Sequence, residues 1–185
     1  FPRDFNTILA LPGIGRYTAG AIASIAFNQP KPVLDGNVIR VLTRLHGIAT
    51  DPQEKETNAR LWRLAENLVT HAKTATNKSA SRPLLPLRAD NRCSFLNQSL
   101  MELGALICTP RSPNCAACPA AQHCFARREN RLEDFPRPKP RAITTPRRFI
   151  AMAVERDGKL LVRQRPGGVV NAHLWEFPNI EADVN

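Results

Sequence analysis

The chain has 185 residues, of which 43% are hydrophobic, and carries a formal net charge of +10 with a pI of about 10.1. No apolar run approaches the roughly 20 residues of a membrane-spanning helix, and the polar start FPRDFNTILA argues against a secretory signal peptide. The length allows one domain, or one domain with part of a second, and the charge indicates a polyanionic partner, either nucleic acid or an anionic membrane surface.

Helical periodicity dominates residues 1–130. Residues 4–10 have the pattern of the end of a helix, which LPGIG at 11–15 interrupts. Further helices are predicted at these places in chain order: 17–27, about 38–47, 58–72 and 93–108. The polar, proline-broken segment between Lys73 and Arg92 is predicted to be a flexible loop.

The composition changes after residue 130. Residues 131–147 are rich in Pro and Arg, which is typical of an interdomain linker. From 148 to 185 the hydrophobic pattern alternates around Asp157 and Gly158, which predicts a β-hairpin, and Trp175 and Phe177 are expected in a core. The chain begins without Met and stops before this second domain could close, so we expect a fragment of a longer protein.

Four of the five cysteines lie close together in the sequence. Their spacing is C-x6-C-x2-C-x5-C, formed by Cys108, Cys115, Cys118 and Cys124. Such spacing lets a compact loop bring four thiolates to one metal centre, and it fits tetrahedral zinc as well as an iron–sulfur cluster. A metal site in place of disulfides indicates a reducing, intracellular compartment. Cys93 lies outside this pattern and is predicted to be a buried free thiol.

The LPGIG segment has the character of a hairpin between two helices. Gly13 and Gly15 lack Cβ atoms, so the backbone can turn tightly there, and its N–H groups can bind a phosphate oxygen at the start of the next helix. Arg16 adds a positive charge. Downstream, Asp35 precedes a predicted helix, where Asp is a preferred N-cap. These residues alone favour a capping role for Asp35 and sequence-independent binding of a DNA backbone.

Two motifs resemble the helix-hairpin-helix superfamily of DNA glycosylases. The cysteine pattern after MELGALIC is similar to the [4Fe–4S] motif of its endonuclease III and MutY branch, and residues 11–38 resemble the core of the superfamily. The resemblance implies that Asp35 is catalytic, that a [4Fe–4S] cluster rather than zinc occupies the cysteines, and that Arg111 contacts a DNA phosphate. A capping bond would then orient the catalytic carboxylate.

The resemblance also discriminates within this branch. In endonuclease III relatives a lysine stands at the place of Tyr17, and a phenol cannot form the Schiff base that strand cleavage requires. GRYTAGAIASIAF closely resembles the MutY adenine glycosylases, which makes Tyr17 a pocket residue. Residues 148–185 resemble the start of the Nudix-like domain of that family, which helps to recognise 8-oxoguanine. Residues 70–94 match least and contain an apparent insertion.

The fold expected from this resemblance is mainly α: part of a helix-hairpin-helix glycosylase domain over 1–130 with an iron–sulfur loop at 108–124, a linker over 131–147, and the start of an α+β Nudix-like domain over 148–185. The implied function is base-excision repair by a monofunctional glycosylase that hydrolyses the N-glycosidic bond of adenine opposite 8-oxoguanine or guanine. The partner is double-stranded DNA, with no membrane, and we expect a monomer in the bacterial cytoplasm or in a nucleus or mitochondrion.

Two alternatives remain for the function. One is a glycosylase and lyase of the endonuclease III type that acts on oxidised pyrimidines, and the other is a non-catalytic iron–sulfur module that binds DNA. In the MutY family the general acid is a glutamate in the N-terminal part of the helical domain, before the region that matches here. No residue of this chain takes that role, Glu102 included, so we expect the fragment alone to be inactive.

Overall fold

The computed structural model describes residues 1–74, 91–137 and 147–182. The chain divides into two units, Phe1–Lys139 and Pro140–Asn185, each with its own internal contacts. The loop predicted between Lys73 and Arg92 lies almost entirely outside the described residues, as does most of the second half of the predicted linker.

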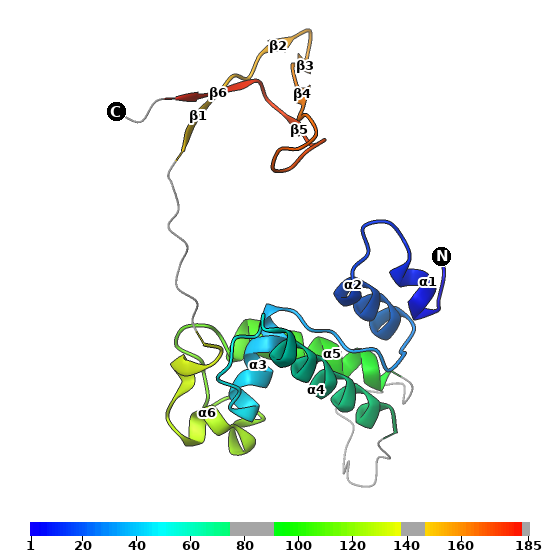
Figure 1. Cartoon of the computed structure of the whole chain (residues 1–185), viewed down its shortest axis with the longest axis vertical. Helices are drawn as coiled ribbons and strands as arrows, with labels where there is room; N and C mark the ends of the chain where they lie inside the picture. Colours follow the sequence, from blue (N-terminus) through cyan, green and yellow to red (C-terminus); the bar gives the residue numbers. More distant parts are fainter. Residues whose placement is uncertain (75–90, 138–146, 183–185) are drawn as a thin grey trace. The chain divides into compact units, whose positions relative to one another are not determined.

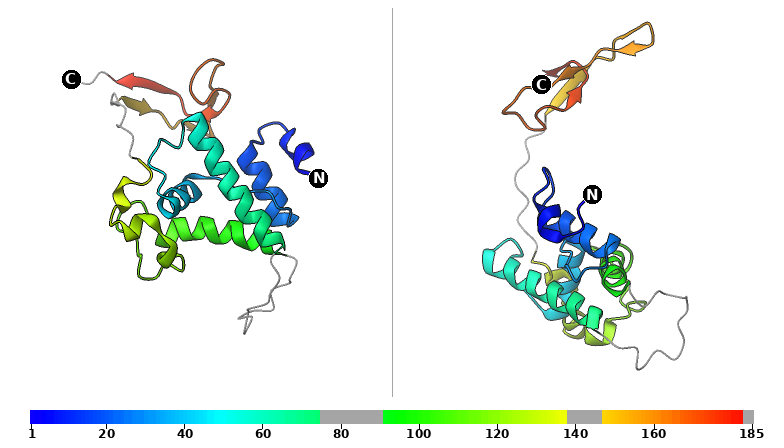
Figure 2. Two further views of the ribbon diagram at one scale, coloured as in Figure 1. Left: turned by 60° about the horizontal axis from the view of Figure 1, so that its bottom comes forward. Right: turned by 90° about the vertical axis from the view of Figure 1, so that its right-hand side faces the viewer.

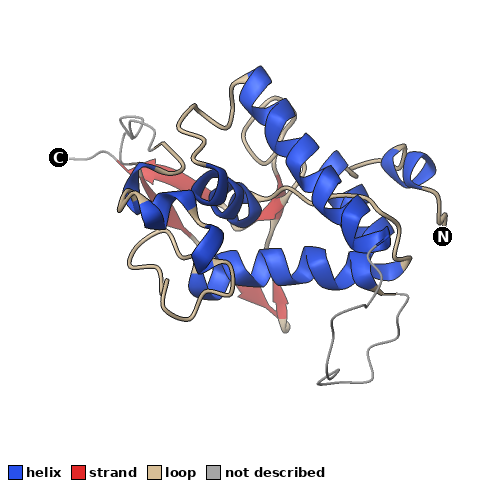
Figure 3. Ribbon diagram, turned by 90° about the horizontal axis from the view of Figure 1, so that it is seen from below, coloured by secondary structure: helices blue, strands red, loops and turns tan. Residues whose placement is uncertain are grey.

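The first unit is built from helices joined by loops (Figures 1 and 3). Its α-helices are α1 (Phe5–Leu9), α2 (Arg16–Ala21), α3 (Gly36–His46), α4 (Lys55–Thr74), α5 (Arg92–Glu102) and α6 (Phe125–Arg128). Two π-helical turns, η1 (Ile22–Ala26) and η2 (Leu103–Ile107), continue α2 and α5, and two short 3₁₀ turns are η3 (Ala121–His123) and η4 (Leu132–Asp134). The prediction of a mainly helical first domain is therefore confirmed.

Two apolar cores stabilise this unit. The first, called here the α3–α4 core, consists of the buried side chains of Val33, Leu34, Val38, Leu42, Ile48, Leu61 and Ala65. The second, the hairpin core, consists of Ile8, Ala19 and Ala23. The long helix α4 lies against α5 (Figure 2). Each amphipathic helix buries its apolar stripe on these cores, which is the main source of helix stability in a domain of this kind.

The segment before the hairpin is a complete short helix rather than the end of one. Asp4 caps α1, because its carboxylate accepts hydrogen bonds from the backbone N–H groups of Asn6 and Thr7. The sequence expectation missed this N-cap. The turn that follows contains Gly13 with φ +78°, a backbone conformation that a residue with a Cβ rarely adopts.

The second unit contains short strands in pairs. They are β1 (Arg148–Ala151), β2 (Glu155–Arg156), β3 (Lys159–Leu160), β4 (Arg163–Gln164), β5 (Trp175–Glu176) and β6 (Asn179–Ala182). Antiparallel pairs form between β1 and β6, β2 and β3, and β4 and β5. The predicted hairpin is confirmed: Asp157 and Gly158, both with positive φ, connect β2 to β3.

The prediction that Trp175 and Phe177 belong to a core is wrong. Trp175 is 67% exposed and Phe177 is 39% exposed. The reason is that each sheet of the described residues has only two strands and no second layer covers either face, so alternation of apolar residues does not lead to burial. Among the described residues, no helix is both long and apolar enough to cross a membrane.

Candidate functional site

Asp35 occupies the N-cap of α3, and its two carboxylate oxygens have different partners. Oδ1 accepts the backbone N–H of Val38 at 2.7 Å, and Oδ2 accepts the side-chain amide of Asn37 at 3.2 Å. The neighbouring Leu34 is buried in the α3–α4 core, while Asp35 itself is half-buried. The predicted cap is confirmed. Its geometry holds a partly exposed carboxylate in a single orientation.

A chain of hydrogen bonds runs from this carboxylate toward the first cysteine of the cluster motif. Arg40 donates from Nη2 to Asn37 Oδ1 at 2.8 Å and to the Gly104 carbonyl at 2.6 Å, and from Nε to the Cys108 carbonyl at 2.7 Å. Burial lowers the pKa of Arg40, and the charges of Cys108 and Asp35 oppose that shift. Sequence reasoning missed Asn37 and Arg40. Their i, i+3 spacing on one helix face was the available signal.

The π-helical turn η2 makes this contact possible. The N–H of Cys108 bonds to the carbonyl of Leu103, five residues back, rather than to that of Gly104. The Gly104 carbonyl is therefore free to accept from Arg40. A Cβ at position 104 would lie 2.6 Å from the Cβ of Asn37, so only glycine permits this close approach.

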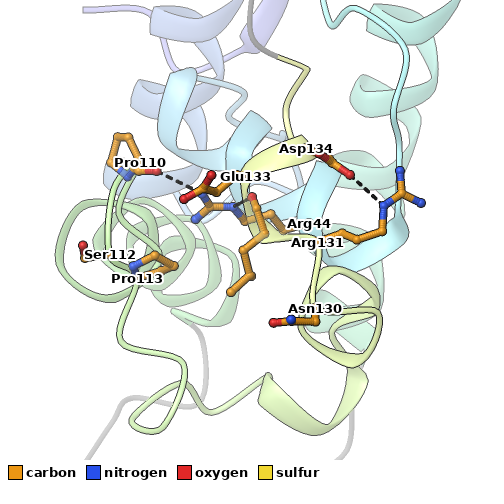
Figure 4. Close-up of a pocket in the computed structure, with 9 residues that line it drawn as sticks. Arg44, Pro110, Ser112, Pro113, Asn130, Arg131, Glu133 and Asp134 are labelled. Carbon is orange, nitrogen blue, oxygen red and sulfur yellow. Dashed lines mark hydrogen bonds and ion pairs between the residues drawn. The ribbon is translucent and has the colours of Figure 1, made fainter.

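Arg44, on the same helix α3, is 2% exposed and is held by backbone carbonyls rather than by a carboxylate. Its acceptors are the carbonyls of Cys108, Thr109, Pro110, Leu132 and Phe135 and the Sγ of Cys108, at 2.7 to 3.4 Å. Figure 4 shows this guanidinium directed toward Pro110, at a polar cavity of about 420 Å³ between residues 110–113 and 130–134. Arg44 thus joins α3 to the segments on both sides of the cysteine loop. The sequence reasoning missed it.

The four cysteines of the motif line one small cavity together with Ile107, Pro113, Asn114, Ala121, Arg127 and Leu132. All four thiols are free and half-buried. Burial raises the pKa of Cys115, and the charges of Cys108, Cys124 and Cys118 raise it further. Among the residues that the structure describes, no three His, Cys, Asp or Glu side chains converge tightly enough to hold a single metal ion.

Cys93 lies apart from this group, as its place in the sequence predicts. Its thiol is buried, and burial raises its pKa. Its backbone N–H donates to Asn28 Oδ1 at 2.9 Å, which places it at the start of α5 as part of the packing.

The hairpin residues lie on the exposed side of α2. Gly13, Gly15, Arg16 and Tyr17 are all exposed, and Gly15 is the N-cap of α2. The guanidinium of Arg16 is stacked over the ring of Trp62 from α4, a partner that sequence reasoning missed. The hydroxyl of Tyr17 donates to Met101 Sδ at 3.6 Å. This contact does not test the role of Tyr17 in a substrate pocket, which stays a prediction. Arg111 is exposed in the cysteine loop, and its role as a phosphate contact also stays a prediction.

Comparison with known proteins places these features in a family. The family model described as "Helix-hairpin-helix motif" matches residues 1–25, which include α1, the Gly13 turn and α2. Adenine DNA glycosylase of Arabidopsis thaliana is 40% identical over 97% of this chain, and that of Buchnera aphidicola is 34% identical over all of it. The chain spans 28% and 48% of those two relatives, which is half their length or less.

A solved structure supports the fold. The structure of a thermostable thymine-DNA glycosylase matches 70% of this chain and 50% of its own, with a TM-score of 0.53 and 31% sequence identity. The fold is that of the helix-hairpin-helix glycosylases, mostly helical with small sheets. Because the similarity covers nearly all of this chain and the hairpin motif matches as well, the chain belongs to the MutY-like helix-hairpin-helix glycosylases.

Proposed function

We propose that the chain forms the hairpin and cysteine-loop part of a base-excision repair enzyme that hydrolyses the N-glycosidic bond of adenine opposite 8-oxoguanine or guanine in double-stranded DNA. The observation that carries this proposal is Asp35, fixed by Val38 and Asn37 at the start of α3, in a chain 40% identical to an adenine DNA glycosylase. A carboxylate at this place has a defined task in the reaction.

The chemistry requires a fixed anion near the sugar. Breaking the bond between adenine and deoxyribose builds positive charge on the sugar, and a preorganised carboxylate stabilises that charge or captures it. Asp35 supplies this anion in the proposed enzyme. Because duplex DNA hides the bond, the adenosine must rotate out of the helix into a pocket. Tyr17 would line that pocket, and its phenol cannot form the Schiff base needed for strand cleavage.

Backbone phosphates are the proposed contact of the hairpin. The exposed backbone at Gly13 and Gly15 and the guanidinium of Arg16 lie together at the start of α2, and Arg111 adds a second exposed cation in the cysteine loop. Such contacts position a protein on DNA without reading its sequence, and their strength falls with salt.

The cysteine motif is proposed to hold a [4Fe–4S] cluster. A tetrahedral zinc ion binds its four sulfurs about 2.3 Å from one point, whereas a cluster takes each thiolate on a separate iron and holds the sulfurs further apart. Cys108, Cys115, Cys118 and Cys124 line one cavity, as a shared centre of either kind requires, and the resemblance of the motif to that of the endonuclease III and MutY branch favours the cluster. The cluster would act here as a structural centre for the 108–124 loop.

A purification without oxygen tests this cofactor. We expect a brown protein that contains iron and acid-labile sulfide, and we expect Cys118→Ser to lose both, whereas the isolated Cys93→Ser retains them. A colourless protein that contains zinc would contradict the assignment.

For the second unit we propose the start of a Nudix-like domain that contributes to recognition of 8-oxoguanine, joined through residues 131–147 to the helical domain at 1–130. The support is the similarity to adenine DNA glycosylases over 97% to 100% of the chain, which includes residues beyond the helical unit. The antiparallel strand pairs of residues 147–182, the hairpin across Asp157 and Gly158 among them, are compatible with the β part of such a domain.

The activity test uses this chain joined to the preceding region that its relatives carry, because departure of adenine also requires a general acid. We expect release of adenine from duplexes with A opposite 8-oxoguanine, and we expect Asp35→Asn to abolish it while DNA binding persists. Adenine release at an unchanged rate by Asp35→Asn would contradict the assignment, and strand cleavage without added alkali would favour a lyase instead.

A further inference from the structure

One side-chain stack crosses between the two apolar cores of the helical unit. Arg16 opens α2, whose residue Ala19 belongs to the hairpin core. Trp62 of α4 packs against the α3–α4 core. The guanidinium carbon of Arg16 lies 4.0 Å from the centroid of the Trp62 ring. Through this stack, the exposed Arg16 is connected to the core that contains Leu34, the residue before Asp35, and Val38, whose N–H donates to the Asp35 carboxylate.

This stack differs from the other contacts of cations with rings among the described residues. In the others the cation lies 4.9 to 5.7 Å from the ring centroid. Several of those arginines also pair with a carboxylate: Arg128 with Glu129, Arg131 with Asp134 and Arg147 with Glu181. Within the described part of the chain, no carboxylate forms an ion pair with Arg16.

A stacked guanidinium retains its capacity to bind an anion. A guanidinium that lies over an aromatic ring can stack face to face on it, and its N–H groups then point out along the edges of its plane. Those edges match two oxygens of a phosphate. Restricting the long side chain before the ligand arrives lowers the entropy that binding has to remove. An indole half-buried in the core is a rigid support for this purpose.

We propose that Trp62 is a positioning residue that holds the Arg16 guanidinium ready for a phosphate of duplex DNA beside the hairpin. The inference deepens the proposed function and rests on it, because it assumes that the hairpin binds the DNA backbone. It adds that the packing of α4 sets the place of this phosphate contact relative to Asp35. Trp62 itself contacts no substrate in this arrangement.

A double-mutant cycle on the 185-residue chain tests the proposal, with a fluorescein-labelled duplex of unrelated sequence as the probe. Arg16→Ala should weaken binding and reduce the slope of log affinity against log salt by about one. Trp62→Leu should weaken binding by about 2- to 5-fold. The affinity of Trp62→Phe should lie between those of the unmutated chain and Trp62→Leu, because phenylalanine keeps a weaker cation–π contact. In the Arg16→Ala background, Trp62→Leu should have no further effect. An equal effect of Trp62→Leu in both backgrounds would overturn the proposal.

A spectroscopic measurement separates this role from a general loss of stability. The chain has two tryptophans, so Trp175→Phe leaves Trp62 as the only reporter. Arg16→Ala should make Trp62 more accessible to acrylamide quenching, whereas Arg63→Ala, which removes an exposed charge next to Trp62 in sequence, should not. If the chain binds DNA but quenching is unchanged by Arg16→Ala, this inference fails and the proposed function stands. If the chain does not bind duplex DNA at any salt concentration, both fail.

Discussion

At the scale of single residues, Asp35 has two roles that share one geometry. The hydrogen bond from the Val38 N–H stabilises the start of α3, and together with the Asn37 amide it directs the carboxylate. The capping bond from Val38 needs only one oxygen acceptor on residue 35, whereas the bond from Asn37 uses the second carboxylate oxygen and stabilisation of a sugar cation needs a negative charge. The two roles can therefore be separated by substitution.

Asp35→Asn and Asp35→Ala should differ in stability while both lack activity. Asparagine keeps an acceptor for Val38 and is an equally good N-cap, so its free energy of unfolding should change by less than about 0.5 kcal/mol. Alanine removes the cap and should cost about 1 kcal/mol. Urea denaturation followed by circular dichroism measures this difference. Equal destabilisation by both substitutions would show that the cap contributes nothing.

Arg44 is the second residue on which the arrangement depends. It is buried, and it satisfies carbonyls on both sides of the cysteine loop. Arg44→Met should lower the free energy of unfolding by about 3 kcal/mol or more, because several buried acceptors lose a charged donor. Arg44→Lys should recover only part of this, since an ammonium cannot reach acceptors in so many directions.

Arg131→Ala is the matched control, because Arg131 makes an exposed ion pair with Asp134. Its effect should stay below about 1 kcal/mol. A loss of stability as small for Arg44→Met as for Arg131→Ala would contradict a structural role for Arg44. The sequence could not predict Arg44, because its acceptors are backbone carbonyls 64 to 91 residues further along the chain. Asp35, in contrast, caps its own helix, and a local pattern is sufficient to find it.

At the scale of elements, the hydrophobic pattern predicted the helices well but not how two of them end. CSFLNQSLMELGALIC reads as one α-helix, and the structure forms α5 followed by the π-helical turn η2. The reason lies in tertiary contacts: the turn releases the Gly104 carbonyl to Arg40 and places Cys108 at the cysteine cavity. Such a requirement leaves no trace in periodicity. The glycine at 104 was the one local sign of it.

Substitution of this glycine tests the role of the turn. In Gly104→Ala the new Cβ would lie 2.6 Å from the Cβ and 2.9 Å from the carbonyl oxygen of Asn37, so α3 and η2 must separate. We expect a loss of about 1–3 kcal/mol in the free energy of unfolding. In the extended protein of the activity test we expect slower adenine release, because Asn37 moves away from Asp35.

Gly36→Ala provides the control, since a Cβ there meets nothing within 4 Å and φ is not positive. Alanine at this first residue of α3 should leave stability unchanged or raise it by up to about 1 kcal/mol. If thermal unfolding shows the two alanine variants to be equally stable, the close approach of Gly104 to Asn37 is not a constraint.

At the scale of the whole molecule, composition predicted two parts joined by a linker, and it gave no sign that part of the linker packs against the first unit. Pro and Arg content marks residues from 131 as a linker, yet Phe135 is 2% exposed and its carbonyl accepts from Arg44. The first unit extends through Lys139. A segment with few apolar residues can still be fixed by one buried ring and its backbone carbonyls, and composition alone does not register that.

The two units should also differ in stability, and this is the prediction for the molecule as a whole. The helical unit has two buried cores, whereas no side chain among residues 147–182 is buried. Two-stranded pairs without a covering layer are marginally stable in water. A chain of residues 1–139 should therefore unfold cooperatively, with a midpoint temperature within a few degrees of that of the 185-residue chain. A chain of residues 147–185 should show no cooperative transition.

Circular dichroism melting of the three chains measures these transitions. Amide hydrogen exchange on the 185-residue chain should give protection confined to residues 1–139. A large fall in the midpoint on removal of residues 140–185 would show that the second unit stabilises the first.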